Sequence, residues 1–283
     1  MQSFQFQTVP NIISGLGSIQ ELKNILSLHP YKKLLLVTDA GMIQHQLHRP
    51  ILDILEQLQL NYCIYSSVQA DPAESIVLDA VQFAKDEHAD VILGFGGGSS
   101  LDVAKIIAVL AHPQQTQTLQ DLYGINQVRE PRLALILVPT TAGTGSEVTP
   151  ISIVTTGETT KIGIVSPVLY ADVAILDAHF TQNLPAHITA ATGIDAMVHA
   201  IEAYTSKIKK NPYADMLAKQ ALRLLDQNLA AVLKDGSNLD ARQNMLVGSM
   251  LAGQAFANAP VAAVHALAYP LGGHFHLSHG HTN

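Results

Sequence analysis

Short apolar runs alternate with helical segments along the first part of this chain, and this alternation limits its possible folds more than any other feature. Four of the runs read as strands buried on both faces: residues 33–39, 61–66, 90–96 and 133–141. Apolar residues recur at intervals of three and four in the segments between them, residues 43–58, 73–88 and 100–112. Strands separated by helices of this length predict a parallel sheet with helices on both faces.

The pattern changes in the second part of the chain. Residues 152–166 predict a hairpin and residues 173–177 a last strand, and no strand pattern follows residues 183–190. The remaining segments are helical by period and propensity: residues 191–206, 212–233, 239–259 and 261–273. We therefore expect an α/β domain at residues 1–180 and an all-α domain at residues 181–283.

The composition argues against several classes of protein. With 48% hydrophobic and 14% charged residues, the chain is globular rather than disordered. Its net charge of −7 argues against nucleic acid as the main partner. The single cysteine, Cys63, excludes an internal disulfide framework and a thiolate zinc cluster. Because neither a secretory-signal pattern nor an apolar run of membrane-spanning length is found, we expect a soluble, cytoplasmic protein.

The stretch "VILGFGGGSSLDVAK" (residues 91–105) has four glycines within five positions, where a predicted strand runs into a predicted helix. Glycines let backbone N–H groups approach a phosphate, and the start of the helix adds the positive end of its dipole. The alternative is a tight turn without a ligand. In the common dinucleotide fingerprint the glycines follow the first strand and an acid comes later, whereas here they follow the third strand and Asp39 comes before them.

A second loop favours a ligand site. The stretch "PTTAGTGSEVT" (residues 139–149) follows the next predicted strand and is rich in hydroxyl and small side chains. Both loops and Asp39 lie at the carboxyl edge of a parallel sheet, where ligands bind. Asp39 can accept hydrogen bonds from a ribose diol and repel a 2′-phosphate, or it can cap a helix.

Histidines form the second group of candidate residues. Asp195 and His199 are four residues apart on a predicted helix and therefore share one face. An acid and a histidine in this arrangement form either half of a metal site or a local hydrogen bond. His265 lies in an otherwise apolar helix, where it is either a core residue or a ligand. Spacing does not choose among the four histidines near the end, His274, His276, His279 and His281. A carboxylate with several imidazoles and no thiolate suits Fe(II) or Zn(II).

Four stretches together resemble the iron-containing alcohol dehydrogenases, the metal-dependent group III family related to glycerol dehydrogenase and dehydroquinate synthase. They are residues 96–105, 139–149, 184–204 and 264–280. The resemblance covers essentially the whole chain. It implies a Rossmann-like domain with a parallel sheet, followed by an all-α metal-binding domain, the architecture of dehydroquinate synthase. The implied function is a NAD-dependent, metal-dependent oxidoreductase that interconverts an alcohol and an aldehyde or ketone.

The resemblance also implies roles for individual residues. The metal, iron with zinc as the alternative, would be bound by Asp195, His199, His265 and His279. Gly97, Gly98 and Ser99 would hold the pyrophosphate of NAD. The diphosphate and nicotinamide ribose would be lined by Thr140, Thr141 and Thr144, and Lys161 would reach the same ribose. Asp39 would favour NAD over NADP.

Two features depart from the family. Many members have a second histidine four residues after the third ligand, and this position is Tyr269, the candidate proton relay here. Members continue with further helices beyond the position of Asn283, so the resemblance implies a chain truncated at its C-terminus. We therefore expect weak activity or weak metal retention, and a tendency to self-associate.

Two alternatives to the implied alcohol dehydrogenase function stay open. The chain is a family relative acting on a polyol, a hydroxy acid or maleylacetate, or it is a non-catalytic remnant that binds nucleotide or metal. We expect a homo-oligomer that binds a small-molecule substrate.

Overall fold

The computed structural model describes residues 3–157, 160–260, 264–268 and 282. These described residues form two compact units. The first, called here the sheet unit, comprises Val9–Pro139 and Pro150–Leu176. The second, called the helical unit, comprises the described residues of Met1–Thr8, Thr140–Thr149 and Asp177–Asn283. The division into domains at residue 180 remains a prediction.

A parallel sheet is the core of the sheet unit. Within the described residues it has six strands, in the order β1 (Asn11–Ser14), β9 (Val173–Leu176), β6 (Ala134–Pro139), β4 (Val91–Gly96), β2 (Lys33–Asp39) and β3 (Asn61–Val68). In its centre Leu36 lies opposite both Leu93 and Ile64, and Leu36 and Leu93 are fully buried. The predicted parallel sheet is therefore confirmed. The short strand β1 has only two apolar residues between polar ones, which is too few to show a strand period, and it was not predicted.

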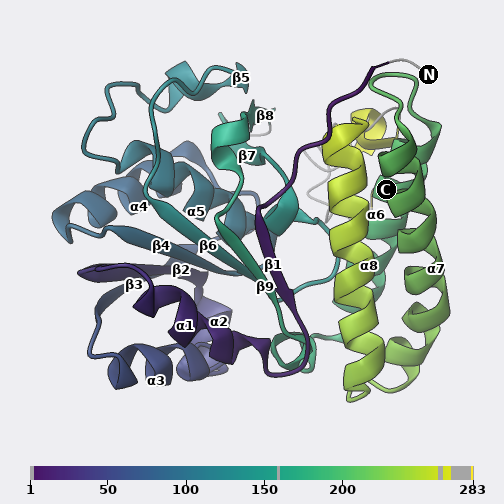
Figure 1. The fold of residues 1–283 in the computed structure, drawn as a ribbon, viewed down its shortest axis with the longest axis horizontal. Helices are drawn as coiled ribbons and strands as arrows, with labels where there is room; N and C mark the ends of the chain where they lie inside the picture. The colour runs from purple at the N-terminus through teal and green to yellow at the C-terminus, as the bar shows by residue number, and fades with distance from the viewer. Residues whose placement is uncertain (1–2, 158–159, 261–263, 269–281, 283) are drawn as a thin grey trace. The chain divides into compact units, whose positions relative to one another are not determined.

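The helices of this unit cover both faces of the sheet (Figure 1). They are α1 (Leu22–Ser27), α2 (Ala40–Gln44), α3 (Arg49–Gln57), α4 (Glu74–Asp86) and α5 (Gly98–Leu110). The chain moves from β2 to β3 in one direction and from β3 through β4 to β6 in the other. Because crossovers between parallel strands are right-handed, α4 and α5 lie on the face opposite to α2 and α3.

The predicted helix at residues 43–58 is wrong as one continuous helix. The chain breaks between α2 and α3, and Gln46 adopts the left-handed conformation with φ 54°. Pro50 stands in the first turn of α3. In a continuous helix its ring would clash with the carbonyl group of Gln46. Proline therefore starts a new helix here, which the apolar period alone did not indicate.

A second, smaller sheet confirms the predicted hairpin at residues 152–166. Strand β7 (Ile151–Thr156) pairs antiparallel with β8 (Thr160–Val165), and the two-residue strand β5 (Gly124–Ile125) pairs parallel with β8. β5 is too short for a periodic signal and was not predicted.

A buried lysine ties the hairpin to α5. The Lys105 side chain is fully buried, and its Nζ donates to the carbonyl oxygen of Ile151 at 2.6 Å and lies 3.5 Å from Asp102 Oδ1. Asp102 Oδ2 in turn accepts from the backbone N–H of Ile153 at 2.9 Å. One turn of α5 thus supplies a cation and an anion to the backbone of β7.

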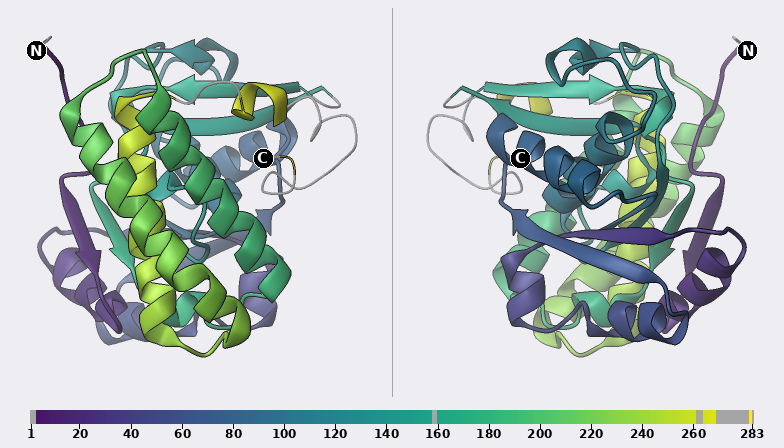
Figure 2. Two further views of the ribbon diagram at one scale, coloured as in Figure 1. Left: turned by 90° about the vertical axis from the view of Figure 1, so that its right-hand side faces the viewer. Right: turned by 90° about the vertical axis from the view of Figure 1, so that its left-hand side faces the viewer.

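The helical unit consists largely of α6 (Ala186–Thr205), α7 (Pro212–Lys234) and α8 (Leu239–Asn258), which pack against one another (Figure 2). Asn211 and Asn238 cap α7 and α8 by accepting from the backbone N–H groups of Ala214 and Ala241. The helices meet through small residues that are fully buried: Ala196, Ala200, Ala203, Ala214, Ala218, Ala221, Ala252 and Ala255. In the part of the chain that the structure describes, no strand follows β9.

The predicted helix at residues 261–273 lies mostly outside the described residues, and residues 264–268 of it are helical. Among the described helices, none is both long enough and apolar enough to cross a membrane.

We expect Lys105→Met to lower the free energy of unfolding by about 1–3 kcal/mol, because it leaves the part-buried Ile151 carbonyl without this donor. Urea denaturation followed by circular dichroism measures the change. Lys85→Met, on the exposed side of α4, is the matched control and should leave the midpoint unchanged. Equal midpoints for both variants would mean that the buried ammonium group contributes no net stability.

Candidate metal centre and nucleotide-binding loops

One face of α6 carries a row of buried ionisable side chains. Asp195, His199 and Glu202 follow one another at intervals of four and three residues, so they lie on the same side of the helix. All of them are buried in the helical unit, although such residues are rarely buried unless they are paired. His265, from the short helical segment 264–268, lies against this row and is also buried.

Asp195, His199 and His265 each direct a donor atom to the same place. These atoms all lie within 4.8 Å of one another. The Nε2 atom of His265 lies 3.7 Å from Oδ1 of Asp195. The two imidazole rings stack, with centroids 4.4 Å apart and an interplanar angle of 16°. Phe256 of α8 also stacks on His199, at 4.4 Å. The structure thus brings together three of the four residues for which the resemblance implies a metal.

Glu202 is a member of this cluster that the sequence analysis missed. Its Oε2 accepts from Nδ1 of His265 at 2.5 Å, and its Oε1 accepts from the backbone N–H of Val264 at 2.7 Å. Burial opposes protonation of His265, but the carboxylates of Asp195 and Glu202 outweigh it and raise the pKa of this imidazole above its ordinary value. The spacing of Glu202 from Asp195 and His199 on α6 was the signal that could have found it.

The donor set fits a borderline divalent metal. One carboxylate and two imidazoles, all buried and without a thiolate among them, match the ligands of Fe(II) and Zn(II) better than those of magnesium or calcium. The predicted fourth ligand, His279, and the candidate proton relay, Tyr269, lie outside the described residues. The other histidines of that segment, His274, His276 and His281, lie outside them as well.

In the sheet unit, Asp39 and the glycine loop end two neighbouring strands. β2 and β4 are adjacent, and the connections that leave them run in opposite directions across the sheet. Such a reversal opens a crevice at the carboxyl edge, the usual ligand site of an open α/β sheet. Asp39 ends β2, and Gly96 ends β4. The sequence-predicted elements therefore meet where a nucleotide can bind.

The glycine loop is built for close approach of a ligand to backbone. Gly96 has φ 149°, and a Cβ atom added to it would lie 2.7 Å from Oγ of Ser100, so a larger residue does not fit. Gly97 is the N-cap residue of α5, and Gly98 and Ser99 form its first turn. Gly97 has no side chain that could cap α5, so the first N–H groups of this helix are available to bind an anion.

Asp39 adopts the helix-capping role that was one of its two predicted alternatives. Its Oδ1 accepts from the backbone N–H groups of Gly41 at 2.8 Å and Met42 at 3.2 Å, at the start of α2. The other oxygen, Oδ2, lies 3.4 Å from the place that a Cβ of Gly96 would occupy. One carboxylate can therefore cap α2 while it also borders the glycine loop. Its role toward a ribose stays a prediction.

The loop at residues 140–149 packs within the helical unit. Thr140 is buried, and Thr141 and Thr144 are half-buried. Oγ1 of Thr144 accepts from the backbone N–H of Ser146 at 3.2 Å. Gly145 has φ 60° and touches Gly253 of α8: a Cβ atom added to Gly253 would lie 2.9 Å from the Cα of Gly145. This glycine pair lets the backbone of the loop lie directly on a helix.

Lys161, the last of the predicted nucleotide residues, has a partner in the sheet unit. Its Nζ lies 2.5 Å from Oδ1 of Asp71, and its side chain is 11% exposed. The hairpin is held to the same segment by a bond from the N–H of Thr155 to the carbonyl oxygen of Pro72, at 2.9 Å. Lys161 therefore fastens β8 to the segment before α4. Contact with a nicotinamide ribose remains a prediction for this residue.

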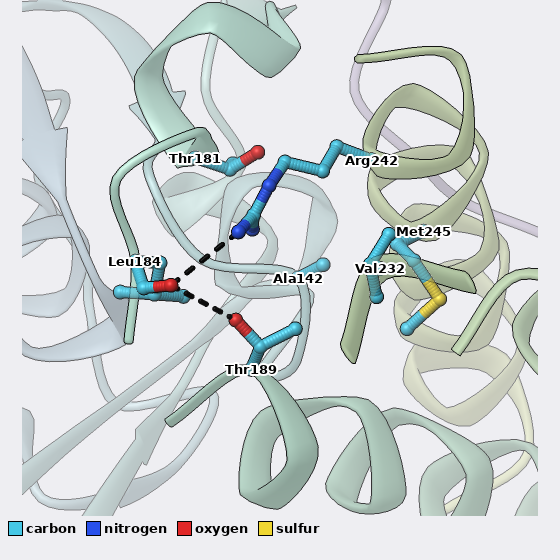
Figure 3. Close-up of a pocket in the computed structure, with 7 residues that line it drawn as sticks. All are labelled: Ala142, Thr181, Leu184, Thr189, Val232, Arg242 and Met245. Atoms are coloured by element: carbon cyan, nitrogen blue, oxygen red, sulfur yellow. Dashed lines mark hydrogen bonds between the residues drawn. The ribbon is translucent and has the colours of Figure 1, made fainter. Parts of the chain in front are cut away.

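A small pocket of the helical unit carries a buried arginine (Figure 3). Its lining is Ala142, Thr181, Leu184, Thr189, Val232, Arg242 and Met245. Arg242 donates to the carbonyl oxygens of Gly236 and Leu184, and Leu184 also accepts from the hydroxyl of Thr189. Burial lowers the pKa of the Arg242 guanidinium. Since backbone carbonyls occupy this guanidinium, we assign it to holding the start of α6 rather than to a ligand.

The chain matches two family descriptions, "Iron-containing alcohol dehydrogenase" over residues 10–178 and "Fe-containing alcohol dehydrogenase family, C-terminal" over residues 189–283. It is 43% identical over 270 residues to long-chain-alcohol dehydrogenase 1 of Geobacillus thermodenitrificans. The aligned residues cover 95% of this chain and 68% of that relative.

Two solved structures are similar to it as well. A 1,3-propanediol oxidoreductase has a TM-score of 0.94 at 37% identity, covering 99% of this chain and 73% of the other. The sulfoacetaldehyde reductase from Bifidobacterium kashiwanohense, in complex with NAD+, has a TM-score of 0.91 at 28% identity, covering 100% and 74%.

We expect Gly253→Ala to lower the free energy of unfolding by about 1–3 kcal/mol, because the new methyl group meets backbone atoms of Gly145 that cannot turn aside. Thermal and urea denaturation measure this effect. Gly163→Ala in β8 is the control, since its new Cβ would find only Cδ1 of Ile153 at 3.5 Å, an ordinary contact. If both variants unfolded at the wild-type midpoint, the contact between loop and helix would be looser than described.

Proposed function

This chain belongs to the iron-containing alcohol dehydrogenase family, and we propose how its residues support the alcohol–carbonyl oxidoreduction of that family with NAD. The observation that carries the proposal is the buried cluster of Asp195, His199 and His265. A carboxylate and two stacked imidazoles are costly to bury, and binding a divalent cation offsets that cost.

The helical unit is the metal-binding part of the proposed enzyme. Asp195, His199, His265 and His279 hold iron, or zinc as the alternative. When bound, the ion is a Lewis acid that lowers the pKa of an alcohol and polarises a carbonyl group. Phe256 packs on His199 and excludes water from that side of the ring, which strengthens the electrostatic interactions in the site.

The dinucleotide is NAD in this proposal, and it supplies or accepts the hydride. Gly97, Gly98 and Ser99 bind the pyrophosphate at the start of α5, where N–H groups and the helix dipole favour an anion. Asp39 accepts from the adenosine ribose and disfavours a 2′-phosphate. Further residues line the diphosphate and the nicotinamide ribose: Thr140, Thr141, Thr144 and Lys161. A relative solved in complex with NAD+ supports this choice of cofactor.

Proton transfer is assigned to Tyr269, with water and ribose hydroxyls as the alternatives. A phenol hydrogen-bonds an alcohol oxygen well, but its ordinary pKa of about 10 makes it a weak base. This residue therefore bears on the substrate range, which includes simple alcohols and aldehydes or ketones and, as alternatives, a polyol, a hydroxy acid or maleylacetate. We further propose a cytoplasmic homo-oligomer that binds no nucleic acid, in keeping with the net charge of −7.

We expect His199→Ala to lower turnover by about 10³-fold or more, because the ion contributes several kcal/mol of charge stabilisation, while NAD binding stays near that of the wild type. NADH oxidation with simple aldehydes, with iron or zinc added, measures turnover, and calorimetry measures NAD binding. His187→Ala, an exposed histidine of the same helix, is the control. A wild-type chain that binds NAD but oxidises no NADH under these conditions would be a nucleotide-binding remnant, and the proposal would fail.

We expect Asp39→Asn to raise the ratio of kcat/KM for NADP over NAD by about tenfold, since a unit charge near a phosphate costs roughly 1–4 kcal/mol at 4 Å. Asparagine caps a helix as well as aspartate does, so the stability of the protein should not change. Asp39→Ala separates the two roles: it should relax the preference and also lower the stability by about 1 kcal/mol. A wild-type protein that used both dinucleotides equally would leave Asp39 with the capping role alone.

A further inference from the structure

We propose that Glu202 is a positioning residue of the metal site: it fixes the orientation and tautomer of His265, so that Nε2 of this imidazole is the atom presented to the metal. The inference rests on the proposed function only in taking Asp195, His199 and His265 as ligands. It concerns a residue outside that ligand set and one that the sequence motifs did not single out.

The first argument is the use of both carboxylate oxygens. Oε2 of Glu202 accepts from Nδ1 of His265 at 2.5 Å, and Oε1 accepts from the N–H of Val264 at 2.7 Å. One carboxylate therefore holds both the ring of His265 and the backbone just before it. The two bonds act together, because the backbone bond fixes where the side chain starts and the ring bond fixes how it turns.

The second argument is the chemistry of the imidazole. An ionised carboxylate has no proton to donate, so the nitrogen that faces it must carry the hydrogen. With the hydrogen on Nδ1, Nε2 of the neutral ring has its lone pair free for a metal. That nitrogen is the one that points to Asp195, at 3.7 Å from Oδ1. Metal-bound histidines commonly donate their other nitrogen to a carboxylate in this way, and the bond raises the basicity of the ligand.

The third argument is position. Glu202 lies seven residues after Asp195, two turns along the same face of α6, and its side chain is only 4% exposed. A buried carboxylate is expensive unless it is hydrogen-bonded. Here its bonds reach across to the segment 264–268, which supplies a ligand but is far from α6 in the sequence. Glu202 thus joins two segments that must meet before the ligands can converge.

The geometry distinguishes this role from direct ligation. The donor atoms that lie within 4.8 Å of one another belong to Asp195, His199 and His265. Both oxygens of Glu202 accept hydrogen bonds from the segment 264–268, one from the N–H of Val264 and one from the ring of His265. Glu202 acts on the metal through His265.

The test uses Co²⁺ alone as the probe, added to the full chain freed of metal. Its affinity is measured by competition with a chromophoric chelator, and its visible absorption reports the ligands around it. Glu202→Gln keeps the volume of the side chain but loses one of the two acceptor oxygens. Glu56→Gln makes the same chemical change at an exposed position of α3 and is the matched control. Thermal unfolding of the metal-free proteins separates a loss of folding from a loss of affinity.

We expect Glu202→Gln to bind Co²⁺ about 10–100-fold more weakly than the wild type, with an unchanged absorption spectrum of the saturated protein and near-native unfolding of the metal-free form. Glu56→Gln should match the wild type. Equal affinity of the Glu202 variant, or an absorption spectrum that shows a lost ligand, overturns the positioning role. A wild-type chain that binds no Co²⁺ overturns the metal site of the proposed function together with this inference, whereas the other two outcomes leave that site standing.

A second measurement does not depend on how the variant folds. Long-range ¹H–¹⁵N spectra of the wild-type imidazoles show which nitrogen of His265 carries the hydrogen, with the resonances assigned by their loss in His265→Gln. Protonation at Nδ1 supports the proposal. A ring protonated at Nε2 alone, with Nδ1 bare toward Glu202, overturns it.

Discussion

Burying Asp195, His199 and Glu202 on one face of α6 removes polar groups from water, and the contacts they form with His265 must offset that cost. Much else in the helical unit serves this requirement. α6, α7 and α8 meet through alanines and glycines, which let the helices approach closely and leave the larger polar side chains enclosed. The segment 264–268 is held to α6 by the two oxygens of Glu202. The hydrogen bonds that offset the cost of burying these side chains therefore also determine how α6 and the segment 264–268 come together.

The sheet unit solves a different problem, which is to present backbone rather than side chains. Its four central strands, β9, β6, β4 and β2, bury nearly all of their apolar residues, and Asp39 and the glycine loop lie at the carboxyl edge where β2 and β4 end. Gly96 at that edge has neither the space nor the backbone conformation for a side chain. Asp39 caps α2 with one oxygen and borders the glycine loop with the other. Strand order places the crevice, and the glycine loop presents backbone N–H groups to it, so this edge can bind an anion without a cationic side chain.

Strongly periodic elements could be predicted from the sequence, and weakly periodic ones could not. The apolar runs of β2 and β4 and the long apolar faces of α4 and α7 repeat often enough to stand out locally. β1 and β5 are four and two residues long and depend on their neighbours for their conformation. The break between α2 and α3 depends on one proline, whose effect an apolar period hides. Glu202 was overlooked because a glutamate on a helix is usually exposed, and only its partners show that this one is not.

By itself the sequence determined the strongly periodic strands and helices, the glycine loop, and Asp195 and His199 on one helix face, because period and spacing are properties of nearby residues. The grouping of His265 with these two residues came from the family resemblance. Tertiary structure alone decided which unit holds the loop at residues 140–149, which oxygen of Asp39 caps α2, and which nitrogen of His265 faces Asp195. Those choices depend on contacts between residues far apart in the chain, such as Gly145 with Gly253 and Glu202 with His265. A hydrogen bond or a close packing contact has a direction and a distance, and neither is defined until the chain has folded.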